Sequence, residues 1–188
     1  MYNKYMNMDQ AKDLIKEKNY VVFKNNLESP DISLFVDLYK NRSDVFDVYA
    51  KNYSNIKIVS DDFLENPSVK EFYNKCLEIY GEPNTFYTFE GAVRSGSNTH
   101  SDSADVVHWQ CHGKSEWTLY DDTSEPVKII LEPGDVIWFK KGQRHSTFNL
   151  EPKMSLIFMS NEDLKKIISE RYTQSGLDFE KPSTHPLT

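Results

Sequence analysis

The residues best suited to chemistry stand in Thr99-His100-Ser101-Asp102 and in Gly142-Gln143-Arg144-His145. His100 and Asp102 are two positions apart, and on an extended strand or at its edge that spacing points both side chains the same way. An imidazole and a carboxylate placed so can occupy one edge of a metal's coordination octahedron. His145, from another strand, would complete a facial set of two histidines and one carboxylate. Such a set leaves three adjacent coordination positions open and is typical of non-haem Fe(II) sites.

Glycines surround the third candidate ligand. His145 lies in the pattern Gly134-x5-Lys140-x-Gly142-x2-His145-x3-Asn149. The glycines permit tight turns on both sides of a strand expected at DVIWFK, and His145 is expected to begin the next strand. The segment resembles the second conserved motif of the cupin superfamily, Gly-x5-Pro-x-Gly-x2-His-x3-Asn, with Lys140 in place of the family's proline.

A longer stretch, from His100 to Phe158, resembles the JmjC and cupin-like Fe(II)- and 2-oxoglutarate-dependent oxygenases. The matching positions, in the family's order, are His100-x-Asp102, Gln110-x2-Gly113-Lys114-x2-Trp117, Leu131-x2-Gly134-Asp135-Val136, Gly142-x2-His145 and Ser155. The resemblance implies a mainly β domain with flanking helices, folded as a double-stranded β-helix (the cupin or jelly-roll barrel). It also implies Fe(II) on His100, Asp102 and His145, with 2-oxoglutarate as co-substrate and O2 as oxidant.

The far carboxylate of 2-oxoglutarate needs a cation or several hydrogen-bond donors in a partly buried pocket. In many JmjC-type relatives a lysine or arginine stands two residues after the turn glycine. That glycine is Gly113 here, and the residue two further on is the neutral Ser115. We rank Lys153 with Ser155 first as the replacement, because other 2-oxoglutarate oxygenases carry Arg-x-Ser at about the same distance after the last histidine ligand.

Other side chains are alternatives for holding the co-substrate. His108 or Lys114 could supply the cation, and so could Arg94, on the strand expected to lead into the metal motif. Hydroxyl or amide groups that could add hydrogen bonds are those of Ser97, Thr99, Tyr87 and Asn149.

The strand around residue 108 also supplies candidate pocket residues. His108, Gln110 and His112 share one face by the two-residue period, and we expect that face to look into the barrel. Cys111 falls on the opposite face, which argues against a metal cluster with the two histidines. The predicted substrate and pocket residues are Trp117, Gln110 and Arg144.

The elements that must position these residues form a strand-rich middle between two helical ends. In residues 85–160, short β-rich runs alternate with turn residues, which predicts about seven strands and a barrel or sandwich. The front, residues 1–84, is predicted to be mainly helical, with helices at 9–18, 29–40 and 66–80 and a short strand at 20–23. A helix and an extended tail are predicted in 161–188.

Length and composition set the class of protein. The 188 residues correspond to roughly one domain, so residues 1–188 are predicted to fold as a single unit. A net charge of −7 argues against a nucleic-acid partner. Two cysteines form no disulfide framework, and neither a secretory apolar segment nor a membrane-spanning run is visible. We therefore expect a cytoplasmic protein without nucleic-acid or membrane partners, with a homodimer left open.

The expected function is hydroxylation or demethylation of a C–H bond in a protein side chain or a small metabolite. Two alternatives stay open at this point. A cupin-type metalloenzyme that does not use 2-oxoglutarate is favoured by the neutral Ser115. A non-catalytic cupin binding module is disfavoured by the complete set of metal ligands.

Overall fold

The computed structural model describes residues 11–24, 27–31, 33, 55–58, 64–80, 85–91, 93–121 and 124–159, and for β2 and β3 it describes the backbone alone. The elements in chain order are α1 (Ala11–Glu17), β1 (Tyr20–Phe23), β2 (Asn55–Ile58), α3 (Pro67–Tyr80), β3 (Thr85–Gly91), β4 (Gly96–His100), β5 (Val106–His112), β6 (Ser115–Asp121), β7 (Ser124–Leu131), β8 (Val136–Phe139), β9 (Arg144–Asn149) and β10 (Lys153–Met159). Most of the helix expected at 29–40 lies outside the described residues, as do the helix and tail expected at 161–188.

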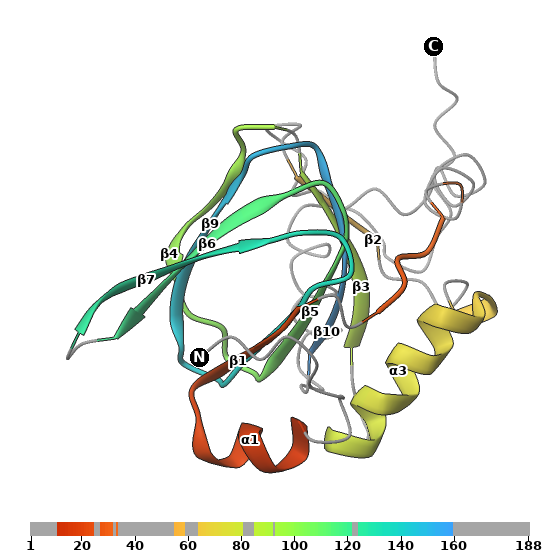
Figure 1. Cartoon of the computed structure of the whole chain (residues 1–188), viewed down its shortest axis with the longest axis horizontal. Coiled ribbons are helices and arrows are strands. Elements are labelled where there is room, and N and C mark those ends of the chain that lie inside the picture. The colour runs from red at the N-terminus through yellow and green to blue at the C-terminus, as the bar shows by residue number, and fades with distance from the viewer. Residues whose placement is uncertain are drawn as a thin grey trace, which may run out of the picture.

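Two antiparallel sheets face each other and enclose a barrel (Figure 1). The six-stranded sheet has the order β1-β8-β5-β10-β3-β2, and the four-stranded sheet has the order β4-β9-β6-β7. The non-sequential neighbours show that the chain crosses repeatedly between the sheets, as in a double-stranded β-helix. The predicted fold class, a mainly β jelly-roll barrel with flanking helices, is confirmed.

The space between the sheets is filled by alternate residues of both. Along β6 the burial alternates, so Ser115, Trp117 and Leu119 point inward while the residues between them are more exposed. Apolar side chains of the two sheets form one buried cluster there: Val22, Ala104, Val106, Trp117, Leu119, Ile129, Leu131, Ile137, Phe139, Ile157 and Met159. This core holds the sheets apart and leaves room for polar residues at selected inward positions.

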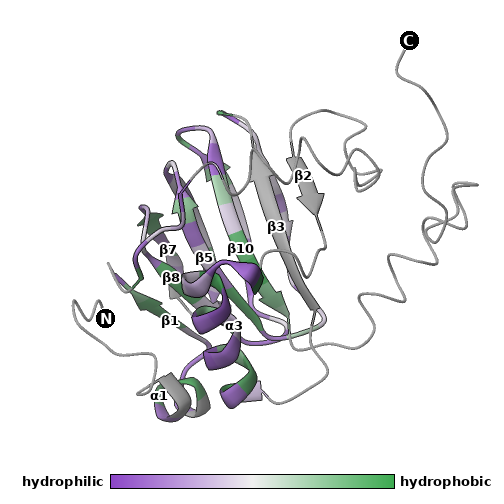
Figure 2. Ribbon diagram, turned by 90° about the vertical axis from the view of Figure 1, so that its right-hand side faces the viewer, coloured by the Kyte–Doolittle hydropathy of each residue, from purple (hydrophilic) through white to green (hydrophobic). Residues whose placement is uncertain are grey.

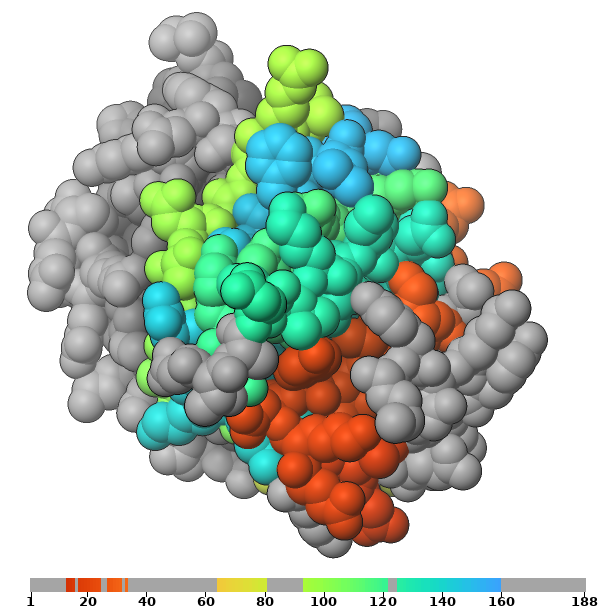
Figure 3. All heavy atoms as spheres, turned by 60° about the vertical axis from the view of Figure 1, so that its left-hand side comes forward, coloured from red at the N-terminus to blue at the C-terminus, as the bar shows by residue number. Residues whose placement is uncertain are grey.

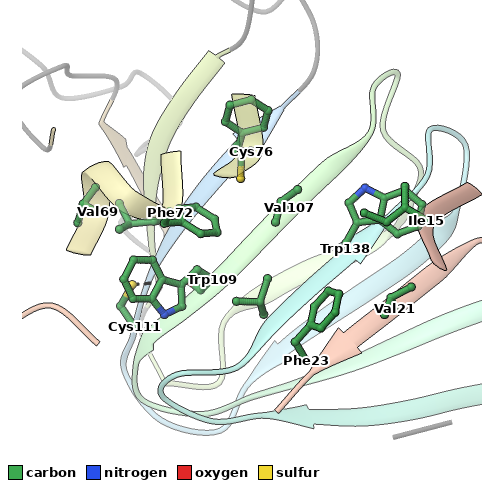
Figure 4. Close-up of a cluster of buried hydrophobic side chains, with 13 residues drawn as sticks. Ile15, Val21, Phe23, Val69, Phe72, Cys76, Val107, Trp109, Cys111 and Trp138 are labelled. Carbon is green, nitrogen blue, oxygen red and sulfur yellow. Dashed lines mark hydrogen bonds between the residues drawn. The ribbon is translucent and has the colours of Figure 1, made fainter. Parts of the chain in front are cut away.

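The helices cover the outer face of the six-stranded sheet (Figure 2). Val69, Phe72 and Cys76 of α3 are buried and point toward the sheet, where Trp109 packs against Phe72 with ring centroids 5.1 Å apart (Figure 4). The start of α3 is capped as predicted, because Asn66 Oδ1 accepts hydrogen bonds from the backbone N–H groups of Ser68 and Val69. No helix of the described part of the chain is long and apolar enough to span a membrane.

The outer face of the four-stranded sheet is different. Its strands form part of the molecular surface (Figure 3), and Val127, Ile130 and Phe148 are exposed large apolar residues on β7 and β9. The helices therefore stabilise one wall of the barrel, and the wall that carries β4 and β9 is more open to solvent.

Three sequence expectations about the strands are corrected. The sheet is not confined to residues 85–160, because β1 pairs with β8 and β2 pairs with β3. The strand at 96–100 was not predicted as a separate strand, since Gly96-Ser97-Asn98-Thr99-His100 is polar and shows no apolar alternation. Arg94 does not lie on a strand: it occupies the turn between β3 and β4 with a left-handed φ of 63°.

Candidate metal centre

The two histidines face each other across neighbouring strands. His100 ends β4 and pairs in register with His145 on β9, and their ring centroids lie 4.3 Å apart. Asp102 follows just after the end of β4, with Oδ2 3.7 Å from His145 Nε2. One ligand atom from each of these three residues lies within 4.8 Å of the others. The sequence prediction of a His-Asp-His cluster is therefore matched by the geometry.

Both histidines present the correct nitrogen to a metal. His100 Nδ1 lies 2.7 Å from the carbonyl oxygen of Asn98, and His145 Nδ1 lies 3.0 Å from that of Gln143. A carbonyl only accepts, so each Nδ1 carries a proton and donates, and in the neutral ring this leaves the lone pair on Nε2. Backbone carbonyls fix metal-ligating histidines in this way in many metalloproteins. Two neutral Nε2 atoms and one carboxylate fit a divalent transition metal such as Fe(II).

The turns that carry the ligands are fastened to each other. The backbone N–H of Gly142 donates to Asp102 O at 3.0 Å, and the N–H of Lys141 donates to Asp105 Oδ1 at 2.7 Å. Gly142 has a φ of +83°, a conformation that glycine adopts without the strain of a side chain. These bonds hold the segment of Asp102 beside the segment of His145 and so help to bring the three candidate ligands together.

His145 lies at the boundary between solvent and the barrel interior. It is 2% exposed, and its ring lies 4.4 Å from that of Phe139 and 5.5 Å from that of Trp117, between centroids. Burial lowers the pKa of His145 below its usual value, although its bond to Gln143 O and the charge of Asp102 oppose this shift. The neutral, metal-binding form is thus favoured. His100 is exposed, so the centre is open on its other side.

Below the metal ligands the interior is polar. Beside His145, the buried polar or charged residues that point between the sheets are His108, Gln110, Ser115, Asn149, Lys153 and Ser155. None of these is acidic. Asp135, the remaining buried charged residue of the described chain, precedes β8 and pairs with Lys24. The inward positions of β5, β6, β9 and β10 therefore carry a lysine and no acidic residue, which suits an anion.

Lys153 is the cation of this interior. It begins β10, is 3% exposed, and its Nζ lies 5.7 Å from the centroid of the Trp117 ring. Burial lowers its pKa from 10.5 to about 7. Gly113 explains how β10 reaches this place, because a Cβ at Gly113 would lie 2.0 Å from the carbonyl oxygen of Pro152. The turn between β5 and β6 therefore needs a glycine for the start of β10 to pack against it.

Of the other residues predicted to hold the co-substrate, some lie around the interior that contains Lys153. Asn149 is buried on β9 and donates from Nδ2 to Ser95 Oγ at 2.9 Å, while Ser97 Oγ lies 2.9 Å from Thr147 Oγ1. Ser155 is fully buried, and its hydroxyl has no hydrogen-bond partner within the described residues. These residues lie around the same interior as Lys153.

Three further predicted residues lie outside this interior, and a fourth stays a prediction. Arg94 and Thr99 are exposed, so neither belongs to the buried group. Arg144 is also exposed and lies over the ring of Tyr120, 5.7 Å from its centroid. Tyr87 lies on β3 opposite Ile157, and its side chain is outside what the structure describes.

Two residues near the centre were missed from the sequence. Phe139 packs on His145, and Thr147 bonds to Ser97. Thr147 is two positions from His145 on the same strand, so the two-residue period of β9 could have identified it. Phe139 lies on β8, and only the three-dimensional arrangement brings it to the metal ligands.

Comparison with known proteins gives a clear result for the fold. No family model and no curated protein sequence matches the chain. Among solved structures, YcfD, a ribosomal oxygenase from Escherichia coli, is similar with a TM-score of 0.63 and 17% identity, over 100% of this chain and 61% of that chain. The same protein in complex with cobalt and succinic acid gives a TM-score of 0.60, at 17% identity over 100% of this chain and 62% of that chain.

A second protein supports the same fold. An oxidoreductase of the 2OG-Fe(II) oxygenase family from Burkholderia pseudomallei has a TM-score of 0.56 and 12% identity, over 85% of this chain and 91% of that chain. At these identities the likeness concerns the fold. The chain shares the double-stranded β-helix fold of these two proteins, and this fold carries a His-Asp-His cluster suited to a metal.

Proposed function

We propose that the protein is an Fe(II)- and 2-oxoglutarate-dependent dioxygenase that hydroxylates or demethylates a C–H bond. The observation that carries this proposal is one continuous arrangement of residues. The facial cluster of His100, Asp102 and His145 lies at the edge of an interior that contains the buried Lys153, and Trp117 contacts both His145 and Lys153. The similar structures support it, since the two proteins are named as oxygenases.

The metal ligands have separate roles in this proposal. His100 and His145 offer neutral Nε2 atoms, and Asp102 offers a negative charge that offsets part of the charge of a divalent cation. When bound, Fe(II) would supply the redox chemistry that couples decarboxylation of 2-oxoglutarate to oxidation of a C–H bond. Phe139 and Trp117 keep water from the inner side of His145, so the reaction takes place beside an apolar wall.

Lys153 would hold the far carboxylate of 2-oxoglutarate. A buried ammonium and a carboxylate stabilise each other strongly where water is excluded. The approach of the carboxylate also raises the pKa of Lys153 and so restores its proton. Ser155 and Asn149 are buried polar neighbours of the same interior and could hydrogen-bond this carboxylate.

The substrate is proposed to be a protein side chain or a small metabolite. The net charge of −7 disfavours nucleic acid. The exposed His100 marks the side from which a substrate would approach. The second candidate function is a cupin-type metalloenzyme without 2-oxoglutarate, and it is favoured only by the neutral Ser115.

The test is succinate formation from 2-oxoglutarate by the full chain with Fe(II), ascorbate and O2. We expect slow turnover without a prime substrate, its loss in His145→Ala, and a raised KM for 2-oxoglutarate in Lys153→Ala. Equilibrium binding of 2-oxoglutarate to the Mn(II)-loaded protein, which does not depend on turnover, is measured beside it. Iron binding with neither succinate formation nor 2-oxoglutarate binding would support the cupin-type alternative.

A further inference from the structure

Ser115 stands at the position where many JmjC-type relatives carry a lysine or arginine, and its hydroxyl bonds to other residues of the barrel. Ser115 is fully buried on β6, and its hydroxyl takes part in two hydrogen bonds. It lies 3.1 Å from Gln110 Oε1 and 3.1 Å from Trp117 Nε1. Both contacts join it to neutral partners of the barrel wall. Ser115 is therefore committed to the protein itself and has little capacity left for a co-substrate.

The direction of each hydrogen bond in this network is determined. Gln110 Nε2 lies 2.8 Å from His112 O and 3.1 Å from Gly113 O, and since carbonyls only accept, the amide nitrogen must face them. Gln110 Oε1 is then the acceptor that faces Ser115, whose hydroxyl donates to it. The indole nitrogen of Trp117 is a donor only, so Ser115 Oγ accepts from it. Backbone carbonyls thus orient the side-chain amide of Gln110, this amide orients the hydroxyl of Ser115, and the hydroxyl orients the indole ring of Trp117.

The orientation of the Trp117 ring matters because two functional groups depend on it. Its plane is nearly parallel to that of His145, at 22°, with 5.5 Å between centroids. Its face receives the ammonium of Lys153, with Nζ 5.7 Å from the centroid, a cation–π contact within the usual limit of about 6 Å. A rotation of the indole would disturb both contacts at once.

We propose that Ser115 is a positioning residue that orients Trp117 and, through it, places Lys153 relative to the metal ligand His145. This inference rests on the proposed function for its effect on 2-oxoglutarate. Its structural part, the bond from Trp117 to Ser115, is independent of any co-substrate. Ser115 acts through Trp117 and does not itself touch the co-substrate.

The first readout is made on the metal-free full chain. The ¹H–¹⁵N indole resonance of Trp117 is assigned by its disappearance in Trp117→Phe. Ser115→Ala should move this resonance upfield, because the indole N–H loses its acceptor. The matched control is Thr118→Val, which removes one hydroxyl from the outer side of the same strand and should leave the resonance in place.

The second readout is kinetic. Ser115→Ala should raise the KM for 2-oxoglutarate about tenfold, the usual scale for a broken buried hydrogen bond, with kcat at saturation changed less than about twofold. Ser115→Cys, which is somewhat larger and keeps a weak hydrogen-bonding group, should fall between wild type and Ser115→Ala in both readouts, and serves if the alanine variant does not fold.

The outcomes separate this inference from the proposed function. An unmoved Trp117 resonance in Ser115→Ala overturns the inference, whatever the wild type does with 2-oxoglutarate. A raised KM with an unmoved resonance also overturns it, because Ser115 would then contact the co-substrate directly. A loss of kcat with unchanged KM would contradict a role through Lys153. A wild type that binds iron but neither binds nor consumes 2-oxoglutarate overturns the proposed function, while the resonance still decides the Ser115–Trp117 bond.

Discussion

A methionine at position 153 should make the metal-free protein more stable at neutral and acidic pH. Burial lowers the pKa of Lys153 from 10.5 to about 7, and each pKa unit corresponds to about 1.4 kcal/mol. Below pH 7 the folded chain must keep a buried ammonium, which opposes folding by up to about 5 kcal/mol. Methionine has a similar unbranched shape and carries no charge, so Lys153→Met removes this penalty.

The pH dependence has a definite sign. Between pH 7 and 10.5 the unfolded chain holds a proton on Lys153 that the folded chain has released, so the free energy of unfolding rises with pH across this window. From pH 6 to pH 9 the titration of Lys153 should raise the free energy of unfolding of the wild type by about 2.5 kcal/mol. Lys153→Met lacks the titrating group, so this rise should be absent from its free energy of unfolding. The stability advantage of the variant should therefore shrink by that amount.

Urea unfolding at pH 6 and pH 9 measures this effect. Lys128→Met is the control, because Lys128 is 67% exposed and its pKa is raised by its hydrogen bond to Glu116, so it stays protonated at both pH values. A stability difference between wild type and Lys153→Met that is the same at pH 6 and pH 9 would refute the reasoning. The same variant should show a raised KM for 2-oxoglutarate, which would indicate that function is maintained here at a cost in stability.

Three further predictions concern the scaffold. Gly113→Ala should lower the free energy of unfolding by about 3 kcal/mol or more, because its φ is +66° and its Cβ would collide with the backbone of Pro152. Gly142→Ala, with φ +83° and nothing within 4 Å of the added Cβ, should lower it by about 1 kcal/mol. Urea unfolding of the two variants compares these values. Asn66→Ala should lower the free energy of unfolding by about 1 kcal/mol through loss of the helix cap, and an unchanged urea midpoint would contradict this. Burial raises the pKa of Cys76 and Cys111, so both thiols should resist alkylation at pH 8 until the protein unfolds; rapid labelling of the native protein would show that one of them is accessible.

Much of the fold could be predicted from sequence because its pattern is local. The placing of Val107, Trp109 and Cys111 of β5 on one face and the capped start of α3 each depend on neighbouring residues, and the structure shows both. A strand was expected to lead into the metal motif, but the bounds of β4 could not be predicted, because Gly96–His100 carries no apolar period and is held by pairing with β9. Likewise, nothing near β1 in the sequence indicates that it joins a sheet with β8, more than 100 residues away.

The candidate site also combines features that a local sequence pattern predicts with features that only the three-dimensional contacts reveal. The cluster of His100, Asp102 and His145 was predicted because the spacing of these residues and the glycines around His145 are encoded locally. The inward position of Lys153 follows from the period of β10, which a sequence can suggest. The commitment of Ser115 to Gln110 and Trp117 could not be predicted, since a serine in sequence looks equally suited to water, to backbone or to a ligand.

The pairing of His100 with His145 has a mechanical consequence. Within the described residues β4 is an edge strand, bonded to β9 on one side. An ion shared by these two strands would act as a removable cross-link, joining positions 43 residues apart between Asp102 and His145. Loading the metal should then slow amide hydrogen exchange along β4, and chelation should release it. The supply of metal would thus govern how readily β4 separates from β9 at this edge of the barrel.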